Sequence, residues 1–343
     1  MGADQSDSET DWKFAPLAVA LGDPAGIGPE IVAKAWMVRE AHKLPPFFAI
    51  GDIASVRQVW NGPVEPVTSP DEASTIFSHA LPCLQTDFAS DSLPGVPGTQ
   101  GTHVALQALE IGIGLAKAGS ASALVTAPVS KSALYTIGFT HPGQTEFIAE
   151  RCGIAAENAV MMLAGQSLRV VPLTVHLPLR AVPDALSIDL ICGRARITTK
   201  GLQRQFGIER PRLWVSGLNP HAGEDGALGL EEREIIAPAI ARLQEEGLDV
   251  SGPFAADGMF HARARECYDA ALCMYHDQAL IPIKTLYFDE GVNMTLGLPI
   301  IRTSPDHGTA FGIAGKNIAH PGAMIAAIRM ARQAVIHRRN NAD

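Results

Sequence analysis

Cysteine and positive charge are both scarce in this chain of 343 residues, and long apolar runs are missing. The five cysteines are an odd number without a Cys-x-x-Cys pair, which favours free thiols in a reducing compartment over a disulfide framework. Lys and Arg number 27 against 36 Asp and Glu, so neither a nucleic acid nor a membrane surface is the expected partner. No apolar stretch is long enough to span a bilayer.

The amino terminus and the bulk composition limit the architecture further. Residues 1–11 are polar and acidic, with neither a basic start nor an apolar core, and we expect a loose, disordered tail and not a signal peptide. Hydrophobic residues make up 47% of the chain, enough for a sizeable core, and the length favours two domains. We therefore expect a two-domain protein of the cytoplasm.

Short apolar runs alternate with segments of helical pattern, which is typical of an α/β fold with a largely parallel sheet. Strands are predicted at 16–21, 47–50, 123–127, 160–163, 170–175, 213–218 and 270–275. Helices are predicted at 30–39, 102–117, 145–150, 231–246 and 321–337, with Gly119 ending the second. Segments 61–72 and 92–102 are rich in Pro, Gly and Ser and are predicted to be long surface loops.

Three histidines, His176, His221 and His276, each stand just beyond one of these apolar runs. If the runs are buried parallel strands, the histidines lie together at the carboxyl edge of one sheet, where open α/β sheets bind ligands. Neutral imidazoles meeting there are suited to hold a metal ion and leave room for substrate. Each histidine taken alone is more often a hydrogen-bonded loop residue, but the shared placement of all three favours a metal site.

Two glycine-containing turns adjoin predicted helices. In Gly22-Asp23-Pro24-Ala25-Gly26-Ile27-Gly28-Pro29-Glu30, backbone N–H groups and a helix start are placed to face an anion or a cofactor. A turn that merely reverses the chain is the alternative, and the glycines alone favour it. In Pro142-Gly143-Gln144-Thr145-Glu146, Thr145 is expected to cap the following helix, and its alternative role is to hold a phosphate.

Cations and carboxylates gather in sequence near the third histidine. Lys284 and Arg302 follow the segment Tyr275-His276-Asp277-Gln278, with the amide Asn293 between them. Lys and Arg are the usual phosphate binders, although each alone is most often a solvated surface charge. Asp257 and Asp277 are candidates to orient the histidines or to ligate the metal, with an ordinary turn residue as the alternative for each.

A glycine-rich segment, 306–317, precedes the last predicted helix. It contains His307, Gly308, Gly315, Lys316 and Asn317. Flexible backbone with a histidine and a lysine suits a loop folded around a nucleotide, and a purely structural loop is an equal alternative.

Taken in order, these segments closely resemble the motifs of one enzyme family, the 4-hydroxythreonine-4-phosphate dehydrogenases of pyridoxal phosphate biosynthesis. The resemblance extends over residues 16–328 and is far more specific than any single motif. Its segments are Gly22-Asp23-Pro24-Ala25-Gly26-Ile27-Gly28-Pro29-Glu30, Thr126-Ala127-Pro128-Val129-Ser130-Lys131, Pro142-Gly143-Gln144-Thr145-Glu146-Phe147, Tyr275-His276-Asp277-Gln278 and His307-Gly308-Thr309-Ala310.

The resemblance implies a fold like that of isocitrate and isopropylmalate dehydrogenases, with two α/β/α domains separated by a cleft. A discontinuous cofactor-side domain would comprise 12–130 and 302–343, and a metal, substrate and dimerisation domain would comprise 131–301. The protein would be a homodimer with a shared active site. The metal ligands would be His176, His221 and His276, the last contributed by the partner subunit.

The resemblance also assigns the remaining site residues. Asp257 and Asp277 would lie near the metal as catalytic candidates. Substrate would be held by Gln144, Thr145, Lys284, Asn293 and Arg302. The cofactor, NAD or NADP, would be bound by Gly22, Asp23, His307, Gly308, Gly315, Lys316 and Asn317, because the loop 307–317 is similar to an adenosine-binding loop of related dehydrogenases.

Two positions depart from the family pattern. The family usually has Gly-His-Thr-Glu where this chain has Gly143-Gln144-Thr145-Glu146. Glutamine donates a neutral hydrogen bond but carries no charge, which bears on substrate preference more than on reaction type. The family's adenosine-type loop usually carries an aspartate where Gly312 stands.

The implied reaction is an NAD(P)-dependent and metal-dependent oxidation of 4-hydroxythreonine 4-phosphate, followed by decarboxylation to 3-amino-2-oxopropyl phosphate. Three imidazoles favour Zn²⁺, with Mg²⁺, Co²⁺ and Ni²⁺ as alternative ions. One alternative function is the same chemistry on a four-carbon sugar-acid phosphate or an aromatic dihydrodiol carboxylate. A more distant one is a non-catalytic metal-binding or nucleotide-binding protein of the same fold.

Overall fold

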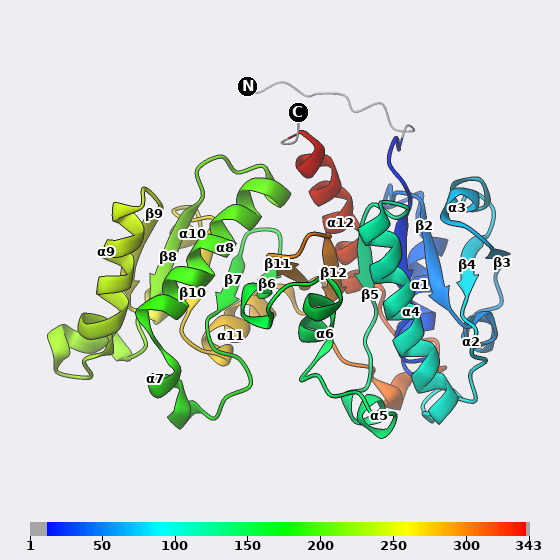
Figure 1. Cartoon of the computed structure of the whole chain (residues 1–343), viewed down its shortest axis with the longest axis horizontal. Coiled ribbons are helices and arrows are strands. Elements are labelled where there is room, and N and C mark those ends of the chain that lie inside the picture. The colour runs from blue at the N-terminus through cyan, green and yellow to red at the C-terminus, as the bar shows by residue number, and fades with distance from the viewer. Residues whose placement is uncertain (1–11, 341–343) are drawn as a thin grey trace. The chain divides into compact units, whose positions relative to one another are not determined.

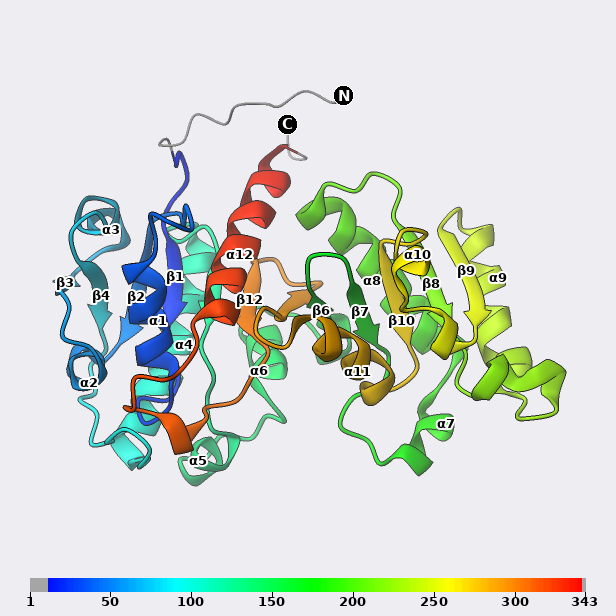
Figure 2. The same cartoon turned by 180° about the vertical axis from the view of Figure 1, so that it is seen from behind.

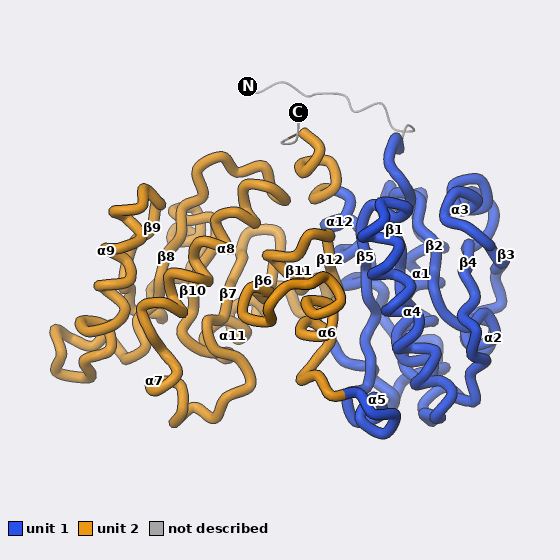
Figure 3. The backbone as a smooth tube through the Cα atoms, in the orientation of Figure 1, with its two compact units in different colours: residues 1–139, 307–332 blue, residues 140–306, 333–343 orange. Residues whose placement is uncertain are grey.

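The computed structural model describes residues 12–340, so the predicted tail at 1–11 lies outside the described residues. The chain divides into two compact units, unit 1 with residues 1–139 and 307–332, and unit 2 with residues 140–306 and 333–343 (Figure 3). Both units are therefore discontinuous in sequence. Residues 333–343 group with unit 2, whereas the sequence-based division assigned them to the cofactor-side domain.

Unit 1 is built on a parallel sheet with the strand order β3-β4-β2-β1-β5. The central strands β1 and β2 are completely buried, which explains their uninterrupted apolar sequences. The strands are β1 (Leu17–Ala20), β2 (Phe47–Gly51), β3 (Val64–Val67), β4 (Leu81–Gln85) and β5 (Leu124–Thr126).

Helices α1 (Gly28–Met37) and α4 (Thr99–Ala118) cover opposite faces of this sheet, as the two opposed views show (Figures 1 and 2). Helix α4 ends at Gly119 in the left-handed conformation, φ 77°, as its sequence predicted. The shorter helices are α2 (Ile53–Val59), α3 (Pro70–Ile76) and α5 (Lys131–Thr136).

Unit 2 contains a mixed sheet in the order β12-β11-β6-β7-β10-β8-β9. Pairing is antiparallel from β12 to β7 and parallel from β7 to β9. Parallel pairing therefore prevails in the two units together, as predicted, with an antiparallel part that the sequence analysis did not anticipate. The strands are β6 (Val160–Ala164), β7 (Arg169–Pro172), β8 (Arg212–Ser216), β9 (Asp249–Phe254), β10 (Ala270–Cys273), β11 (Val292–Leu296) and β12 (Arg302–Pro305).

The faces of the unit 2 sheet are also covered by helices, with α8 on one side and α11 on the other (Figures 1 and 2). The last helix, α12, runs from unit 1 into unit 2. The helices are α6 (Gln144–Arg151), α7 (Val182–Ala185), α8 (Ile188–Phe206), α9 (Ala237–Glu245), α10 (Ala262–Arg265), α11 (His276–Tyr287) and α12 (Gly322–Asn340).

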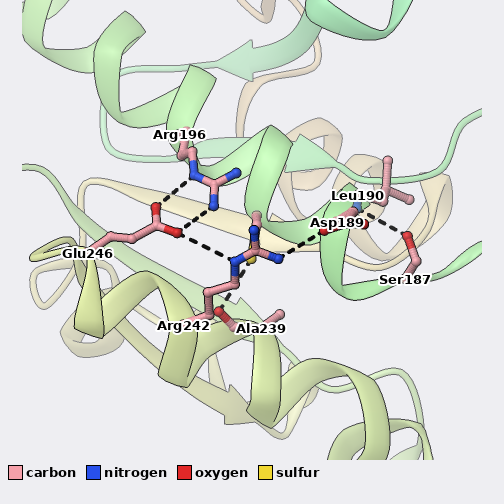
Figure 4. Close-up of polar contacts among 8 residues, drawn as sticks. Ser187, Asp189, Leu190, Arg196, Ala239, Arg242 and Glu246 are labelled. Atoms are coloured by element: carbon pink, nitrogen blue, oxygen red, sulfur yellow. Dashed lines mark hydrogen bonds and ion pairs between the residues drawn. The ribbon is translucent and has the colours of Figure 1, made fainter.

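A chain of ion pairs joins α8 to α9 (Figure 4). Arg196 donates from Nε to Oε2 of Glu246 at 2.7 Å, and Arg242 donates from Nη1 to Oδ1 of Asp189 at 3.0 Å. Ser187 caps α8 by accepting a hydrogen bond from the Leu190 N–H. Because these side chains are exposed, the ion pairs contribute little to stability. Their effect is to hold α8 and α9 in one position along each other.

Two segments differ from their sequence-based prediction. The predicted loop at 61–72 contains β3 and the start of α3, and the predicted loop at 92–102 contains the start of α4. Strand β3 includes Pro66, which is compatible with its place at the edge of the sheet but obscures a strand in the sequence. No helix among residues 12–340 is long and apolar enough to cross a membrane.

Gly297, directly after β11, provides a test of the fold. Its φ is +86°, and a Cβ there would lie far inside contact distance of the Asn158 carbonyl oxygen. Gly153 also has positive φ, +71°, but has open space around it. We expect Gly153→Ala to lower the free energy of unfolding by about 1–2 kcal/mol and Gly297→Ala by at least about 3 kcal/mol. Urea unfolding measures both, and equal losses would contradict this close approach.

Candidate functional site

The three predicted metal-binding histidines follow three neighbouring strands. Strand β10 lies between β7 and β8 and is parallel to both. His176 comes four residues after the end of β7, His221 five after β8, and His276 three after β10. The strand-end placement predicted from the sequence is therefore correct, since all three loops leave the carboxyl edge of one parallel segment.

The backbone at two of these histidines is unusual. His176 has φ 54° and His221 has φ 52°, both in the left-handed region that non-glycine residues seldom adopt. The five residues 221–225 all have positive φ. Each of these residues except Gly223 costs about 1–2 kcal/mol, so the surrounding structure must hold this loop in place.

The imidazoles are not gathered into one cluster within a single chain. The rings of His176 and His276 lie 6.0 Å apart between centroids. His221 instead contacts Glu224, with 2.8 Å between Nδ1 and Oε2, and this contact raises the His221 pKa, with a smaller contribution from Asp257. In residues 12–340 no group of three or more His, Cys, Asp or Glu side chains is close enough to hold a metal ion.

The two candidate aspartates lie beside different histidines. Asp277 accepts from Nδ1 of His276, with 2.7 Å between Nδ1 and Oδ1, at the first turn of α11. Asp257 lies in an exposed 3-10 turn, and its charge acts on His221. A carboxylate on Nδ1 leaves Nε2 of a neutral imidazole as the metal-binding atom, so Asp277 has the geometry of an orienting residue.

Gln278 joins the ends of β8 and β10, a role that sequence reasoning missed. Its side-chain oxygen accepts from the Ser216 hydroxyl and from the Met274 N–H, both at 2.7 Å. Its amide nitrogen donates to the Gly217 carbonyl at 2.8 Å. Thr174, after β7, donates to the Met274 carbonyl at 2.8 Å. These buried hydrogen bonds tie together the three strand ends that carry the histidines.

Glu232 anchors the start of the His221 loop, and this role was also missed. Its Oε1 accepts the N–H groups of Leu218 and Asn219 at 2.8 and 2.7 Å, and its Oε2 accepts from the Asn219 amide at 3.0 Å. Burial opposes ionisation of this carboxyl, but the hydrogen bonds outweigh it and lower its pKa. The only sequence signal was a glutamate within a predicted helix.

Arg302, at the start of β12, is the buried cation of unit 2. It is 3% exposed, and burial lowers its pKa to about 10, while the nearby charge of Glu146 acts in the opposite direction. Its Nη1 donates to the Thr295 hydroxyl at 3.1 Å and its Nη2 to Oε1 of Gln144 at 3.4 Å. The structure thus brings together two predicted substrate residues, Gln144 and Arg302, that are far apart in sequence.

The other predicted substrate residues lie on three elements of unit 2. Lys284, on α11, approaches Oδ2 of Asp306 at 3.2 Å. Asn293, on β11, has a buried Oδ1 without a hydrogen-bond partner among the described residues. Thr145 lies inside the first turn of α6, and Gly143 occupies the capping position, so the expectation that Thr145 caps this helix was wrong.

In unit 1 the turn after β1 is held against the chain that follows β5. Gly22 has φ 69°, and a side chain there would collide with the Pro128 carbonyl, which accepts the Asp23 N–H at 3.0 Å. Asp23 is buried and accepts the Ala25 N–H at 3.0 Å. Burial raises the Asp23 pKa, against the hydrogen bonds from Ala25 and Ser130. The chain-reversal interpretation of these glycines therefore has direct structural support.

The predicted nucleotide loop, 307–317, packs against this same turn. The Ile27 N–H donates to the Thr309 carbonyl at 3.0 Å. Beyond the loop, the buried carboxylate of Glu30, on α1, accepts the Ala319 N–H at 3.0 Å. The two segments predicted to bind cofactor thus lie side by side in unit 1.

Side chains of this loop remain available for a ligand. His307 donates from Nδ1 to the Gly308 carbonyl at 3.0 Å, and its Nε2 is buried with no hydrogen-bond partner in the described part of the chain. Lys316 and Asn317 are exposed, and Gly315, with φ 73°, turns the backbone before them.

The sequence and the fold were compared with known proteins. The family model described as pyridoxal phosphate biosynthetic protein PdxA matches residues 39–331. The 4-hydroxythreonine-4-phosphate dehydrogenase of Zymomonas mobilis is 60% identical over 94% of this chain and 96% of its own length. The crystal structure of 4-hydroxythreonine-4-phosphate dehydrogenase from Klebsiella pneumoniae matches with a TM-score of 0.84 at 35% identity, covering 94% of this chain and 99% of that one.

A more distant likeness concerns the fold alone. Isocitrate dehydrogenase from Methylococcus capsulatus matches with a TM-score of 0.50 at 14% identity, over 95% of this chain and 87% of its own. The predicted α/β class related to isocitrate dehydrogenase is confirmed.

Glu232 gives a testable consequence of this geometry. Because its pKa is lower in the folded state than its ordinary value of 4.5, its stabilising effect is present above that value and is lost as the pH falls through the folded-state pKa. We expect Glu232→Gln to be destabilised by about 2 kcal/mol at pH 7 and by progressively less as the pH falls below 4.5 and through the folded-state pKa. Glu234→Gln, at an exposed ion pair with Arg233, is the control and should change little at either pH. A pH-independent loss for Glu232→Gln would contradict the anchoring role.

Proposed function

Because this chain belongs to the PdxA family of pyridoxal phosphate biosynthetic proteins, we propose that it acts in the cytoplasm on 4-hydroxythreonine 4-phosphate. It is an oxidoreductase of the 4-hydroxythreonine-4-phosphate dehydrogenase kind. The proposed reaction takes up NAD or NADP, oxidises the secondary alcohol beside the amino-bearing carbon, and releases CO₂ and 3-amino-2-oxopropyl phosphate.

One observation carries this proposal: helix α11 begins with a proposed metal ligand and carries a proposed phosphate ligand. His276 is its first residue and Lys284 lies eight residues further along, about 12 Å at 1.5 Å per residue. In the substrate the alcohol and the phosphate are on adjacent carbons, so the flexible ammonium of Lys284 would have to reach back along the helix toward the imidazole for the two groups to hold one molecule.

The residues proposed to bind the divalent metal carry imidazole donors and come from two subunits. The proposed ligands are His176, His221 and the partner subunit's His276. The absence of a complete cluster in residues 12–340 is compatible with a site completed by a second subunit, whereas the rings 6.0 Å apart, His176 and His276, belong to one chain. When bound, the metal supplies Lewis acidity at the alcohol oxygen, while the nicotinamide accepts hydride.

The phosphate is proposed to be held by cations and neutral donors of unit 2. Lys284 and Arg302 supply charge, and the Arg302 guanidinium forms strong hydrogen bonds because it is desolvated. Thr145 and Gln144, in the first turn of α6, offer a hydroxyl and an amide beside the helix N-terminus. The unpartnered Oδ1 of Asn293 is an acceptor for a substrate N–H or O–H group.

Cofactor binding is proposed for unit 1, through the loop 307–317 and the turn that contains Gly22 and Asp23. The buried, unpartnered Nε2 of His307 provides a hydrogen-bond site for an adenine or a ribose. Lys316 and Asn317 are exposed beside it and would bind the adenosine side of the molecule.

Large exposed hydrophobic residues support the proposed homodimer. Leu177 and Leu179, just after His176, are 46% and 66% exposed, and Ile281 and Phe288, on and just after α11, are 64% and 77% exposed. Apolar side chains of this size at a protein surface are typical of an interface. A second copy of the chain covering them would bring its α11, with His276, close to the proposed metal site.

Metal binding can be tested at His221. Loss of one of three ligands should weaken divalent-metal affinity by at least about 100-fold, with loss of turnover. His221→Ala is compared with His79→Ala, an exposed histidine of unit 1, by metal analysis after dialysis and by NAD(P)H formation. Normal metal content and activity in His221→Ala would exclude this site.

The shared site is tested with the same assay. Equal amounts of inactive His176→Ala and inactive His276→Ala protomers are mixed and allowed to exchange. Heterodimers should contain one intact site, with activity approaching one quarter of the wild-type value. Demonstrated exchange without any recovered activity would show that each chain forms its own site.

Gln144 bears on substrate selectivity. Its Oε1 lies 3.4 Å from Nη2 of buried Arg302, so a histidine at this position would be disfavoured as a cation and should ionise below its ordinary pKa of about 6.5. We expect Gln144→His to keep the reaction, change KM for the phosphorylated substrate several-fold, and add an ionisation below pH 6.5 to kcat/KM. Gln58→His, on exposed α2, should do neither. An unchanged KM and pH profile in Gln144→His would mean that this residue does not contact the substrate.

A further inference from the structure

A basic pocket in unit 2 contains none of the residues of the proposed active site. It has a volume of about 280 Å³ and lies between the second half of α8, the segment after β11 and the end of α12. Lys200 and Arg204 from α8, Arg338 from α12, and Leu298 after β11 line it. A volume of this size accommodates a small ligand such as a phosphate monoester of a few carbons.

The charge in this pocket is of one sign. None of its lining residues in the described part of the chain is acidic. Burial lowers the pKa of Arg338, and the Arg204 guanidinium lowers it further, because two like charges face each other. A bound anion would relieve this repulsion.

Two of the three cations in this pocket have an ordinary explanation, because they lie at the C-terminal ends of helices. Arg204 and Arg338 lie in the last turns of α8 and α12, where cations offset the partial negative charge of the helix C-terminus. Arg338 also donates from Nη2 to the Pro299 carbonyl at 2.5 Å, which fixes it at the pocket. Lys200 lies more than a turn before the end of α8, so the same explanation does not extend to it.

Gln205 supplies an independent sign of a ligand. It lines the pocket, is only 6% exposed, and its side-chain Oε1 is buried without a hydrogen-bond partner among residues 12–340. A buried acceptor without a donor costs about 1–3 kcal/mol, and a donor from a bound molecule would remove that cost. Because the dianion of a phosphate monoester carries no donor on its phosphate, the molecule that satisfies both features has a phosphate and a separate hydroxyl.

We propose that this pocket binds a small hydroxylated phosphate monoester, with its phosphate on Lys200, Arg204 and Arg338 and its hydroxyl on Gln205. The site is separate from the proposed substrate site, whose cations are Lys284 and Arg302. The enzyme would then have a second binding site for phosphorylated metabolites.

Calorimetric titration tests this with methyl phosphate and glycerol 3-phosphate as probes, at low and at physiological ionic strength. The protein carries Lys284→Gln, which weakens phosphate binding at the proposed substrate site. We expect one saturable site per chain that binds glycerol 3-phosphate several-fold more tightly than methyl phosphate, which has no hydroxyl. Arg204→Gln and Arg338→Gln should each weaken both probes at least about 10-fold. Arg210→Gln, an exposed arginine outside this pocket, should leave both unchanged.

The variant Gln205→Met distinguishes an effect on ligand binding from an effect on folding. It removes the unpartnered acceptor while keeping the side-chain volume, so the free energy of unfolding should stay the same or rise. The preference for glycerol 3-phosphate over methyl phosphate should disappear. Arg204 is exposed, so its variant is expected to fold even if Arg338→Gln does not. Absence of saturable binding, equal weakening by Arg210→Gln, or a preference that survives in Gln205→Met would overturn the proposal.

Discussion

The hydrogen bonds of Gln278 at the ends of β8 and β10 are the interaction on which the candidate site depends. One buried amide satisfies groups on both strand ends, and Thr174 extends the connection to the segment after β7. Because these groups are shielded from water, breaking one leaves an unsatisfied polar atom, so the arrangement is resistant to small displacements. The three histidine loops therefore start from a rigid base even though His176 and His221 have strained backbone.

In the proposed function the two units have separate roles, and each has its own physical requirement. Unit 2 must keep a charged guanidinium, Arg302, away from water, which strengthens its hydrogen bonds and costs desolvation. Unit 1 must keep an irregular glycine-containing loop in a defined shape, and it does so with backbone hydrogen bonds such as that between Ile27 and Thr309. The basic pocket beside α8 and α12 also gathers cations, of which Arg338 is partly buried and Lys200 and Arg204 are exposed, at a place that the family motifs do not include.

Much of the fold was predictable because its strands are buried on both faces. Strands β1, β2 and β10 are fully buried, so their sequences are unbroken apolar runs that stand out without any structure. Strand β12, Arg-Thr-Ser-Pro, is buried too but polar, and it carries the proposed substrate residue Arg302; it was not predicted. Helix α11 was hidden by the internal Pro282 and by its position directly after a strand.

The sequence by itself determined that three histidines follow strand ends and that lysine, arginine and amide side chains accompany the last of them, since these are local facts about residue order. Only the tertiary structure decided that β10 lies between β7 and β8, that Gln144 meets Arg302, and that Glu232 holds the His221 loop. Strand order and contacts across 158 residues depend on packing of the whole sheet, and no local pattern encodes them. The same reason applies to the pocket of Lys200, Arg204 and Arg338, whose cations come from two helices that are distant in sequence and meet only in the folded chain.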